Sequence, residues 1–259
     1  MKLSIIVVTL NAGRELTATL KSIITQEYDD FEILIKDGGS TDGSLDNLPK
    51  DPRILLLSRP DTGIYDAMNQ ALEAASGDYV LFINCGDYLY DVYVLSDVVP
   101  LLNEPNSVVY GDILDRMAGA RVTSNPNLDE FALYRNVPCH QACIYDRKML
   151  LAHPFQTEYL VRADYEQFLW CHYIARAKMI YANRVISSYM GGGFSATREN
   201  RRLSAREHGE IVARYMSPEN VSKYRRRMIL SLSPLRRLLA GNPVTGGLYN
   251  RIKTKAYKT

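Results

Sequence analysis

Carboxylate side chains follow two apolar stretches of this sequence, at positions where they could bind a cation or accept hydrogen bonds from a ligand. One stretch leads into the loop Asp37-Gly38-Gly39-Ser40-Thr41-Asp42-Gly43, and the other into Asn84-Cys85-Gly86-Asp87. Glycines leave the backbone N–H groups of such loops accessible, so both loops are candidates for binding a polar ligand. Taken singly, the first loop could also be a helix-capping turn and the second an ordinary turn.

The elements that must hold these loops are strands of a parallel sheet. The apolar stretches at 3–10 and 80–83 are typical of buried strands, and 31–36 and 54–57 are two further predicted strands. Helical spacing of apolar residues predicts one helix after the first stretch, ending near residue 26, and another at 64–75. This β-α-β order predicts right-handed crossovers and helices on both faces of the sheet. Because parallel strands end at one edge, both carboxylate loops open where α/β sheets bind ligands.

The second half of the sequence has a less regular pattern. We expect an α/β domain at residues 1–200, with a mostly parallel sheet flanked by helices, and a basic helical C-terminal extension at residues 201–259. The helices predicted in this half are 94–102, 165–175, 198–215 and 218–232, and the predicted strands are 107–113, its hairpin partner 121–123, then 141–145, 178–181 and 185–189.

The composition is that of a soluble globular protein, with 46% hydrophobic and 23% charged residues. The spacing of the four cysteines fits neither a disulfide framework nor paired zinc ligands, so we expect free thiols in a reducing compartment. The first apolar run is short for a signal peptide and we interpret it as a strand, and no stretch reaches transmembrane length. Residues 201–259 contain 14 Lys and Arg against 3 Asp and Glu, so a basic tail follows an acidic body.

Three further segments accompany the carboxylate loops: Asp61-Thr62-Gly63-Ile64-Tyr65-Asp66-Ala67-Met68-Asn69, His140-Gln141 and Met190-Gly191-Gly192-Gly193-Phe194-Ser195. Together with the strand order, these motifs resemble the inverting family 2 glycosyltransferases of GT-A fold. The resemblance is closest to bacterial polysaccharide transferases of the colanic-acid type, and it covers Leu3 to Ser195. It implies a nucleotide-diphospho-sugar donor bound at the edge of the sheet.

The resemblance also implies how the donor is bound. Asp37 is expected to accept a hydrogen bond from a nucleobase N–H group. The family's metal motif, Asp-x-Asp, is replaced by Asn84-Cys85-Gly86-Asp87, so Asp87 is expected to bind Mn²⁺ or Mg²⁺ that bridges the donor phosphates, whereas Asn84 offers a neutral amide. The expected donor-binding residues are Thr9, Asn11, Asp37, Gly38, Asp61, Tyr65, Asp66, Asn69, Asn84, Gly86 and Asp87.

Sugar transfer also needs a base that deprotonates the acceptor hydroxyl. In the family this base is an acid at the start of a helix, and Ala163-Asp164-Tyr165-Glu166 occupies that place here. Asp164 is therefore the expected base and Glu166 the second candidate, although acids are also favoured at any helix start. The segment His140-Gln141 is expected to face the acceptor, unless His140 only caps or fills the core. The expected closing loop contains Gly192, Gly193 and Ser195.

These expectations combine into an inverting glycosyltransferase that acts on a growing bacterial surface glycan, linked to a polyprenyl diphosphate. A nucleotidyltransferase is one alternative, but Asn11-Ala12-Gly13-Arg14 is a poor match to the basic glycine-rich loop it needs. A catalytically impaired sugar-nucleotide-binding module is another, because Asn84 stands where an acid is expected.

The basic tail predicts where the protein works. Tyr224–Leu230 and Pro234–Leu239 mix cations with apolar residues, which is typical of a helix on an anionic membrane surface. We expect a cytoplasmic protein that docks on the inner face of the cell membrane, and a solvated helix packed on the domain is the alternative. No nucleic-acid recognition motif accompanies the charge, so nucleic acid is not an expected partner.

Overall fold

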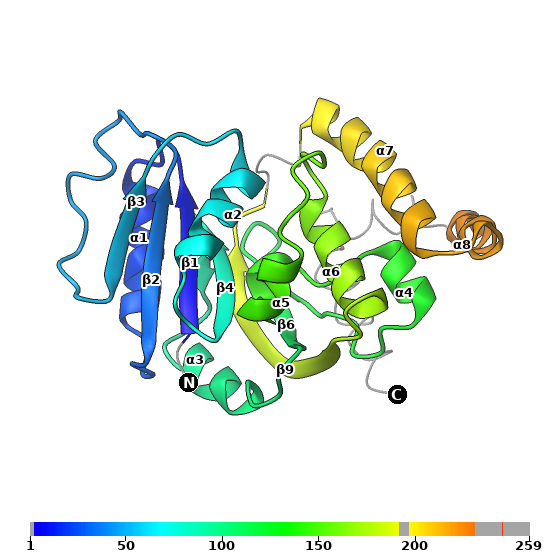
Figure 1. The fold of residues 1–259 in the computed structure, drawn as a ribbon, viewed down its shortest axis with the longest axis horizontal. Coiled ribbons are helices and arrows are strands. Elements are labelled where there is room, and N and C mark those ends of the chain that lie inside the picture. The colour runs from blue at the N-terminus through cyan, green and yellow to red at the C-terminus, as the bar shows by residue number, and fades with distance from the viewer. Residues whose placement is uncertain (1–2, 192–196, 231–244, 246–259) are drawn as a thin grey trace.

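The protein forms a nine-stranded sheet with helices on both faces, as seen in a computed structural model that describes residues 3–191, 197–230 and 245 (Figure 1). Eight strands follow the order β3-β2-β1-β4-β8-β6-β9-β5, and β7 pairs with β6 outside this path. The α/β class predicted from the sequence is confirmed.

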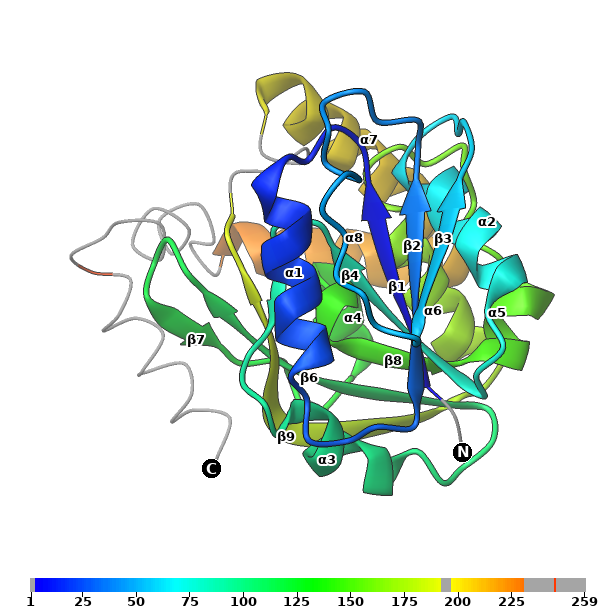
Figure 2. The same cartoon turned by 90° about the vertical axis from the view of Figure 1, so that its left-hand side faces the viewer.

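The first four strands are parallel to one another, as predicted. In the register of the sheet, Thr9 lies opposite Asp37 and Val8 opposite Asn84, so the two carboxylate loops start at the same edge. Figure 2 shows the arrows of β1, β2 and β3 pointing upward to this edge, to the right of α1 in that view. The elements are β1 (Leu3–Thr9), α1 (Arg14–Ile24), β2 (Phe31–Asp37), β3 (Ile54–Ser58), α2 (Ile64–Ala74) and β4 (Tyr79–Asn84).

The other half of the sheet is mixed rather than parallel. Strand β8 is antiparallel to both β4 and β6, β9 is parallel to β6, and β5 and β7 are antiparallel to their partners. The mostly parallel arrangement therefore holds for the first half only. The elements are β5 (Tyr88–Leu89), α3 (Val94–Val98), a 3-10 turn (Val99–Leu101), β6 (Ser107–Asp115), β7 (Ala120–Val122), α4 (Glu130–Arg135), a 3-10 turn (His140–Ala142), β8 (Cys143–Asp146), α5 (Arg147–Ala152), α6 (Ala163–Tyr173) and β9 (Lys178–Tyr189).

Three predicted strands differ from the structure. The strand expected at 141–145 begins only at Cys143, because His140–Ala142 form a 3-10 turn that opens toward the sheet edge. The two strands expected at 178–181 and 185–189 are one strand, β9. The polar middle of β9 resembles a break in the sequence, but the irregularity at Asn183, which has a φ of 50°, is absorbed by register shifts between β6 and β9.

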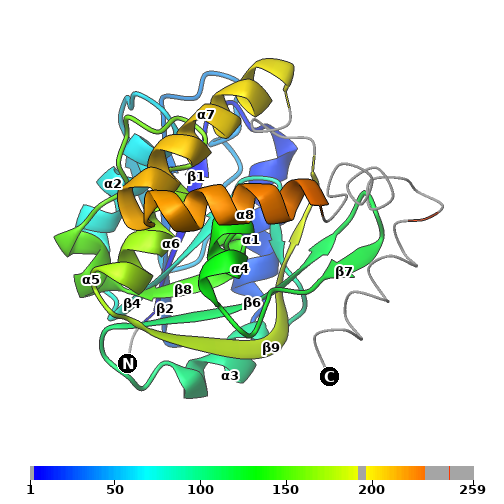
Figure 3. The same cartoon turned by 90° about the vertical axis from the view of Figure 1, so that its right-hand side faces the viewer.

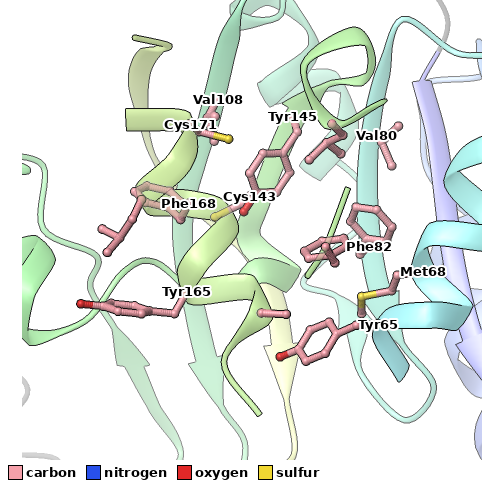
Figure 4. Close-up of a cluster of buried hydrophobic side chains, with 14 of the residues drawn as sticks. Tyr65, Met68, Val80, Phe82, Val108, Cys143, Tyr145, Tyr165, Phe168 and Cys171 are labelled. Atoms are coloured by element: carbon pink, nitrogen blue, oxygen red, sulfur yellow. The ribbon is translucent and has the colours of Figure 1, made fainter. Parts of the chain in front are cut away.

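Two hydrophobic cores hold the helices to the sheet. Alternate residues of β1 point to opposite faces, so Ile5 and Val7 pack with α1 and α3 whereas Ile6 and Val8 pack with α2. The second of these cores extends through α5 and α6, and Figure 4 shows its aromatic centre, with rings from α2, β4, β8 and α6 side by side. The start of α6 is thus fixed against the start of α2.

Helices α7 (Arg198–Tyr215) and α8 (Pro218–Leu230) cover one side of the domain. Helix α7 contacts α6, and α8 contacts both α7 and α4 (Figure 3). The domain boundary expected at residue 200 falls inside α7, whose Ile211 and Val212 are buried in the core shared with α6. Among the helices that the structure describes, none has the length and apolar character needed to cross a membrane.

Candidate active site

A cavity of about 990 Å³ opens at the edge where β1 and β4 end. Its other walls come from the end of β6, the 3-10 turn before β8 and the start of α6. A cavity of this size accommodates a nucleotide sugar. The predicted site residues that line it are Thr9, Tyr65, Asn84, Gly86, Asp87, His140, Gln141 and Asp164.

Seven other predicted residues lie outside the lining of this cavity: Asn11, Asp37, Gly38, Asp61, Asp66, Asn69 and Glu166. The predicted loop residues Gly192, Gly193 and Ser195 lie outside the described residues.

Asp37 is fully buried and its carboxylate already has several donors. Oδ1 accepts hydrogen bonds from the hydroxyl and the N–H group of Ser40, and Oδ2 accepts from Ser58 Oγ at 2.7 Å and Gly39 N at 3.0 Å. Burial acts to raise the pKa of Asp37, but these hydrogen bonds outweigh it and hold the pKa below its usual value. The carboxylate therefore orders the loop after β2, and a nucleobase N–H must replace one of these donors to reach it.

Two further residues join the loops at the sheet edge. The Asn11 N–H group donates to Ser40 Oγ at 2.8 Å, and Asn11 Oδ1 accepts from Thr41 N at 2.9 Å. Gly38 approaches the next loop so closely that a Cβ atom there would lie 2.8 Å from Asp61 Oδ2. The loops after β1, β2 and β3 are therefore held as one unit, and Gly38 is needed for its space.

The segment 61–69 is held mainly by contacts within the protein. Asp61 pairs with the fully buried Lys36 at 2.7 Å. Asp66 accepts hydrogen bonds from Thr62 and Gln70, and Asn69 bonds both the N–H and the C=O of Phe155. Of the predicted residues in this segment, only Tyr65 lines the cavity.

Asp87 is the buried carboxylate of the cavity, with 7% of its surface exposed. Gln141 Nε2 donates to Oδ2 at 2.8 Å and Met190 N donates to Oδ1 at 3.3 Å. Burial raises the pKa of Asp87, and the Gln141 hydrogen bond opposes this only in part. A buried carboxylate in this state gains most from a nearby cation.

The residues around Asp87 fit a divalent cation that is shared with donor phosphates. Asn84 Oδ1 is buried and has no hydrogen-bond partner among the residues that the structure describes. One carboxylate plus an amide oxygen suits Mg²⁺ or Mn²⁺, which bind through few protein oxygens when phosphates complete the coordination. Within the same residues, no group of three or more His, Cys, Asp or Glu could hold a metal alone.

Asp164 faces the cavity from the first turn of α6, with 25% of its side chain exposed. Its Oδ1 accepts from Tyr65 OH at 3.1 Å and Tyr165 N at 2.9 Å, and Oδ2 lies 3.1 Å from His140 Nδ1. Burial acts to raise the pKa of Asp164, but the hydrogen bond and charge of His140 lower it below the usual value. The carboxylate is therefore ionised at neutral pH, fixed in direction and open on one side, which are the properties of a general base.

Glu166 lies on another face of α6 and is fully buried. It accepts hydrogen bonds from Tyr215 OH and from Arg214, and it lies 3.1 Å from His153 Nε2. The structure thus brings Asp164 to the cavity and joins Glu166 to the end of α7.

Sequence reasoning missed two residues that shape this site. Arg116 follows β6 and lines the cavity, and Glu207 on α7 holds the segment before Asp164. A search for carboxylates after strands passes over Arg116, which lies three residues beyond the strand predicted at 107–113 and directly after the observed β6. Glu207 falls within the basic tail, although Ile211 one turn later marks that face of the helix as buried.

Glu207 binds three successive backbone N–H groups ahead of α6. Its oxygens accept from Leu160, Val161 and Arg162 at 2.9–3.0 Å, and the Glu207 side chain is buried. Arg162 Nε also donates to the hydroxyl of Ser204 on α7, at 2.8 Å. Helix α7 therefore fixes the chain two residues before Asp164.

We expect Glu207→Gln to destabilise the protein by about 2–3 kcal/mol, because the amide turns an N–H group toward backbone donors and loses charge-assisted hydrogen bonds. This corresponds to a fall of roughly 5–10 °C in the melting temperature. Turnover is expected to fall about tenfold as Asp164 loses its position. Calorimetry and transfer kinetics measure both effects. Glu210→Gln, which removes an exposed ion pair with Arg206 on the same helix, is the matched control; equal results for both variants would contradict this role of Glu207.

Comparisons with known proteins identify the family of this chain. The sequence profile described as "Glycosyl transferase family 2" matches residues 4–163. A "PGL/p-HBAD biosynthesis glycosyltransferase" of Mycobacterium bovis BCG is 36% identical over 205 residues, which are 75% of this chain and 79% of the relative.

Two solved structures are similar in fold. Residues 1–349 of S. aureus TarS superpose with a TM-score of 0.66 at 20% identity, covering 90% of this chain and 73% of that one. The mannosyltransferase PcManGT from Pyrobaculum calidifontis, in complex with GDP-Man and Mn²⁺, gives a TM-score of 0.61 at 18% identity and covers 98% and 84%. The profile spans more than half of the chain, so this protein is a glycosyltransferase of family 2 with the GT-A fold.

Proposed function

We propose that this protein is an inverting transferase that moves a sugar from a nucleotide-diphosphate donor to a hydroxyl of a growing, lipid-linked bacterial surface glycan. The observation that carries the proposal is the pairing of Asp87 and Asp164 in one cavity. Asp87 suits the diphosphate end of the donor, and Asp164 suits the acceptor hydroxyl. The names of similar proteins support a nucleotide-sugar donor, since TarS structures contain UDP or UDP-GlcNAc.

The proposed reaction is a single displacement at the anomeric carbon. Asp164 takes the proton of the acceptor hydroxyl as its oxygen forms a bond to the sugar, and the electron pair of the broken C–O bond leaves with the nucleoside diphosphate. His140 and Tyr65 hold Asp164 in place for this step. Asp87 and Asn84 would hold the divalent cation, which supplies charge neutralisation for the leaving group when bound. The acceptor enters opposite the leaving group, so the anomeric configuration inverts.

A thermal-shift screen with UDP-, GDP- and dTDP-sugars, with and without Mn²⁺, tests the donor part of this proposal. One nucleotide is expected to raise the melting temperature in a concentration-dependent way, more so with Mn²⁺. NMR of the product formed from that donor then gives the anomeric configuration. A product with retained configuration would contradict the single displacement, and no shift with any donor would contradict the function.

We also propose that α8 docks the protein on an anionic membrane surface. The exposed side chains of this helix combine the cations of Lys223, Arg225 and Arg226 with the apolar Ile229 and Leu230. Cations interleaved with apolar residues favour the interface of a membrane that contains anionic lipid. A protein held there would meet a lipid-linked acceptor.

Replacing both Arg225 and Arg226 with Gln is expected to weaken binding to phosphatidylserine vesicles about 30-fold, because each cation near the surface contributes about 1 kcal/mol. Co-sedimentation at low salt measures the change. The matched control is the double variant Arg201→Gln/Arg202→Gln, which removes two exposed cations from α7 instead. If both double variants bind as tightly as the unmodified protein, docking through α8 is excluded.

A further inference from the structure

Arg116 is fixed against the loop that carries Asp87. It follows β6, and its N–H group donates to Tyr189 O at 2.9 Å. The guanidinium group lies over the ring of Tyr88 at 4.2 Å from the centroid, and Nη2 donates to the carbonyl oxygen of Gly86. Tyr88 is itself held through a hydrogen bond of 3.0 Å from its hydroxyl group to Glu15. These contacts place a permanent positive charge in the cavity wall beside Asp87.

Arg116 forms no direct ion pair in the part of the chain that the structure describes, although its charge acts on the nearby carboxylate of Asp87. Two other partly buried arginines form ion pairs: Arg53 with Asp51, and Arg184 with Asp91 and Asp97. The Nε atoms of two more, Arg147 and Arg162, donate hydrogen bonds to Gly77 and Ser204. Nε of Arg116 is buried and lacks a hydrogen-bond partner among the described residues. A partly buried guanidinium group whose Nε lacks an acceptor, in the wall of a cavity, is suited to an anionic ligand.

The chemistry of the loop selects the kind of anion. Asn84 and Arg116 line the same cavity, and the neutral amide of Asn84 adds no negative charge to it. A guanidinium group presents several N–H donors in a plane, which matches two phosphate oxygens better than an ammonium group does. On the proposed function, the anion expected beside Asp87 is the diphosphate of the donor.

We propose that Arg116 is a donor-binding catalytic residue that contacts this diphosphate directly. It balances the negative charge that builds on the leaving group as the bond between the sugar and the diphosphate breaks, close to Asp87, which would hold the cation. This assignment rests on the proposed function. The competing role is purely structural, in which Arg116 only holds the loop at Gly86 against Tyr88.

The test compares a nucleoside diphosphate with its nucleoside, because only the first offers phosphate oxygens. Calorimetry with UDP and uridine, or GDP and guanosine if GDP binds better, is carried out in EDTA so that no cation contributes. Arg116→Met is expected to weaken diphosphate binding about 10- to 100-fold with little change for the nucleoside. Arg116→Lys, which keeps a point charge but loses the planar donors, is expected to lose about three- to tenfold. Arg226→Met removes an exposed cation and should leave both affinities unchanged.

Three results would overturn the assignment. A ratio of diphosphate to nucleoside affinity that stays unchanged in Arg116→Met shows that the residue is only structural, even if the melting temperature falls. If that variant does not fold, an unchanged ratio in Arg116→Lys shows the same. If the unmodified protein binds neither diphosphate nor any sugar nucleotide in the thermal-shift screen, the proposed function fails and the assignment falls with it.

Discussion

Asp164→Asn is expected to lower the turnover number about 10²- to 10⁴-fold while the apparent affinity for the donor stays within a few-fold. A positioned base contributes this much to a proton transfer, and an asparagine amide cannot take the proton. The substitution keeps the shape of the side chain and an oxygen that can accept from Tyr65 and Tyr165. Steady-state and single-turnover kinetics with the donor identified by thermal shift measure the loss and assign it to the chemical step.

Glu166→Gln provides the comparison on the same helix. Glu166 is fully buried and bonded to Tyr215, Arg214 and His153, so its replacement should lower stability by about 2–4 kcal/mol through lost charged hydrogen bonds. The folded fraction of this variant should turn over within a few-fold of the unmodified protein. If Asp164→Asn transferred sugar at the normal rate, or if Glu166→Gln alone abolished turnover in folded protein, the base assignment would be lost.

The pH dependence of turnover is a second test of the role of Asp164. A base must be ionised to work, so turnover falls as pH decreases through the pKa of Asp164. Burial acts to raise this pKa, but the contact with His140 lowers it below the usual carboxyl value. The decline in turnover that is due to Asp164 is therefore expected at a pH below the pKa of an ordinary aspartate.

Most of the first half of the fold was predictable because its information is local. The strands there are short segments made mostly of apolar residues, such as 3–9 or 79–84, and each connection has glycines or a helix of clear periodicity. The sheet edge follows from the parallel order, which is why Asp87 could be expected at the edge where the cavity lies. The same reasoning could not show that β8 runs antiparallel, since strand direction there is set by partners far along the chain.

The roles of individual polar residues were harder to predict, because tertiary neighbours decide them. Asp61 is a ligand candidate in the sequence, but the buried Lys36 from β2 pairs with it. Asn69 is also a ligand candidate in the sequence, but its side chain forms hydrogen bonds with the backbone of Phe155. Glu207 shows the opposite case, an acid in a basic helix that supports the start of α6. The sequence alone does not show which carboxylate pairs with a lysine and which one lines a cavity.

On the proposed function, Asp87→Asn is expected to lower cation-supported turnover about 10²- to 10³-fold, because the cation that would neutralise the leaving group loses the carboxylate proposed to hold it. The same substitution should raise the melting temperature of the ligand-free protein at neutral pH. Burial raises the pKa of Asp87 above its value in the unfolded chain, despite the hydrogen bond from Gln141. Stability from this group is therefore fully present below the unfolded pKa and is lost as pH rises through the folded pKa.

Asparagine copies the protonated, uncharged carboxyl and keeps an oxygen for Gln141, so the variant retains that stability at neutral pH. Scanning calorimetry from acid to neutral pH should show melting temperatures that converge in acid and diverge toward neutrality, with the variant higher. Asp46→Asn, at an exposed turn, controls for the loss of one charge. If turnover of Asp87→Asn stayed normal and equally sensitive to EDTA, Asp87 would not be a ligand of the cation. A lower melting temperature of Asp87→Asn would show that the carboxylate stabilises the fold. A higher one would show that the carboxylate lowers stability, which is expected of a residue retained to bind a ligand.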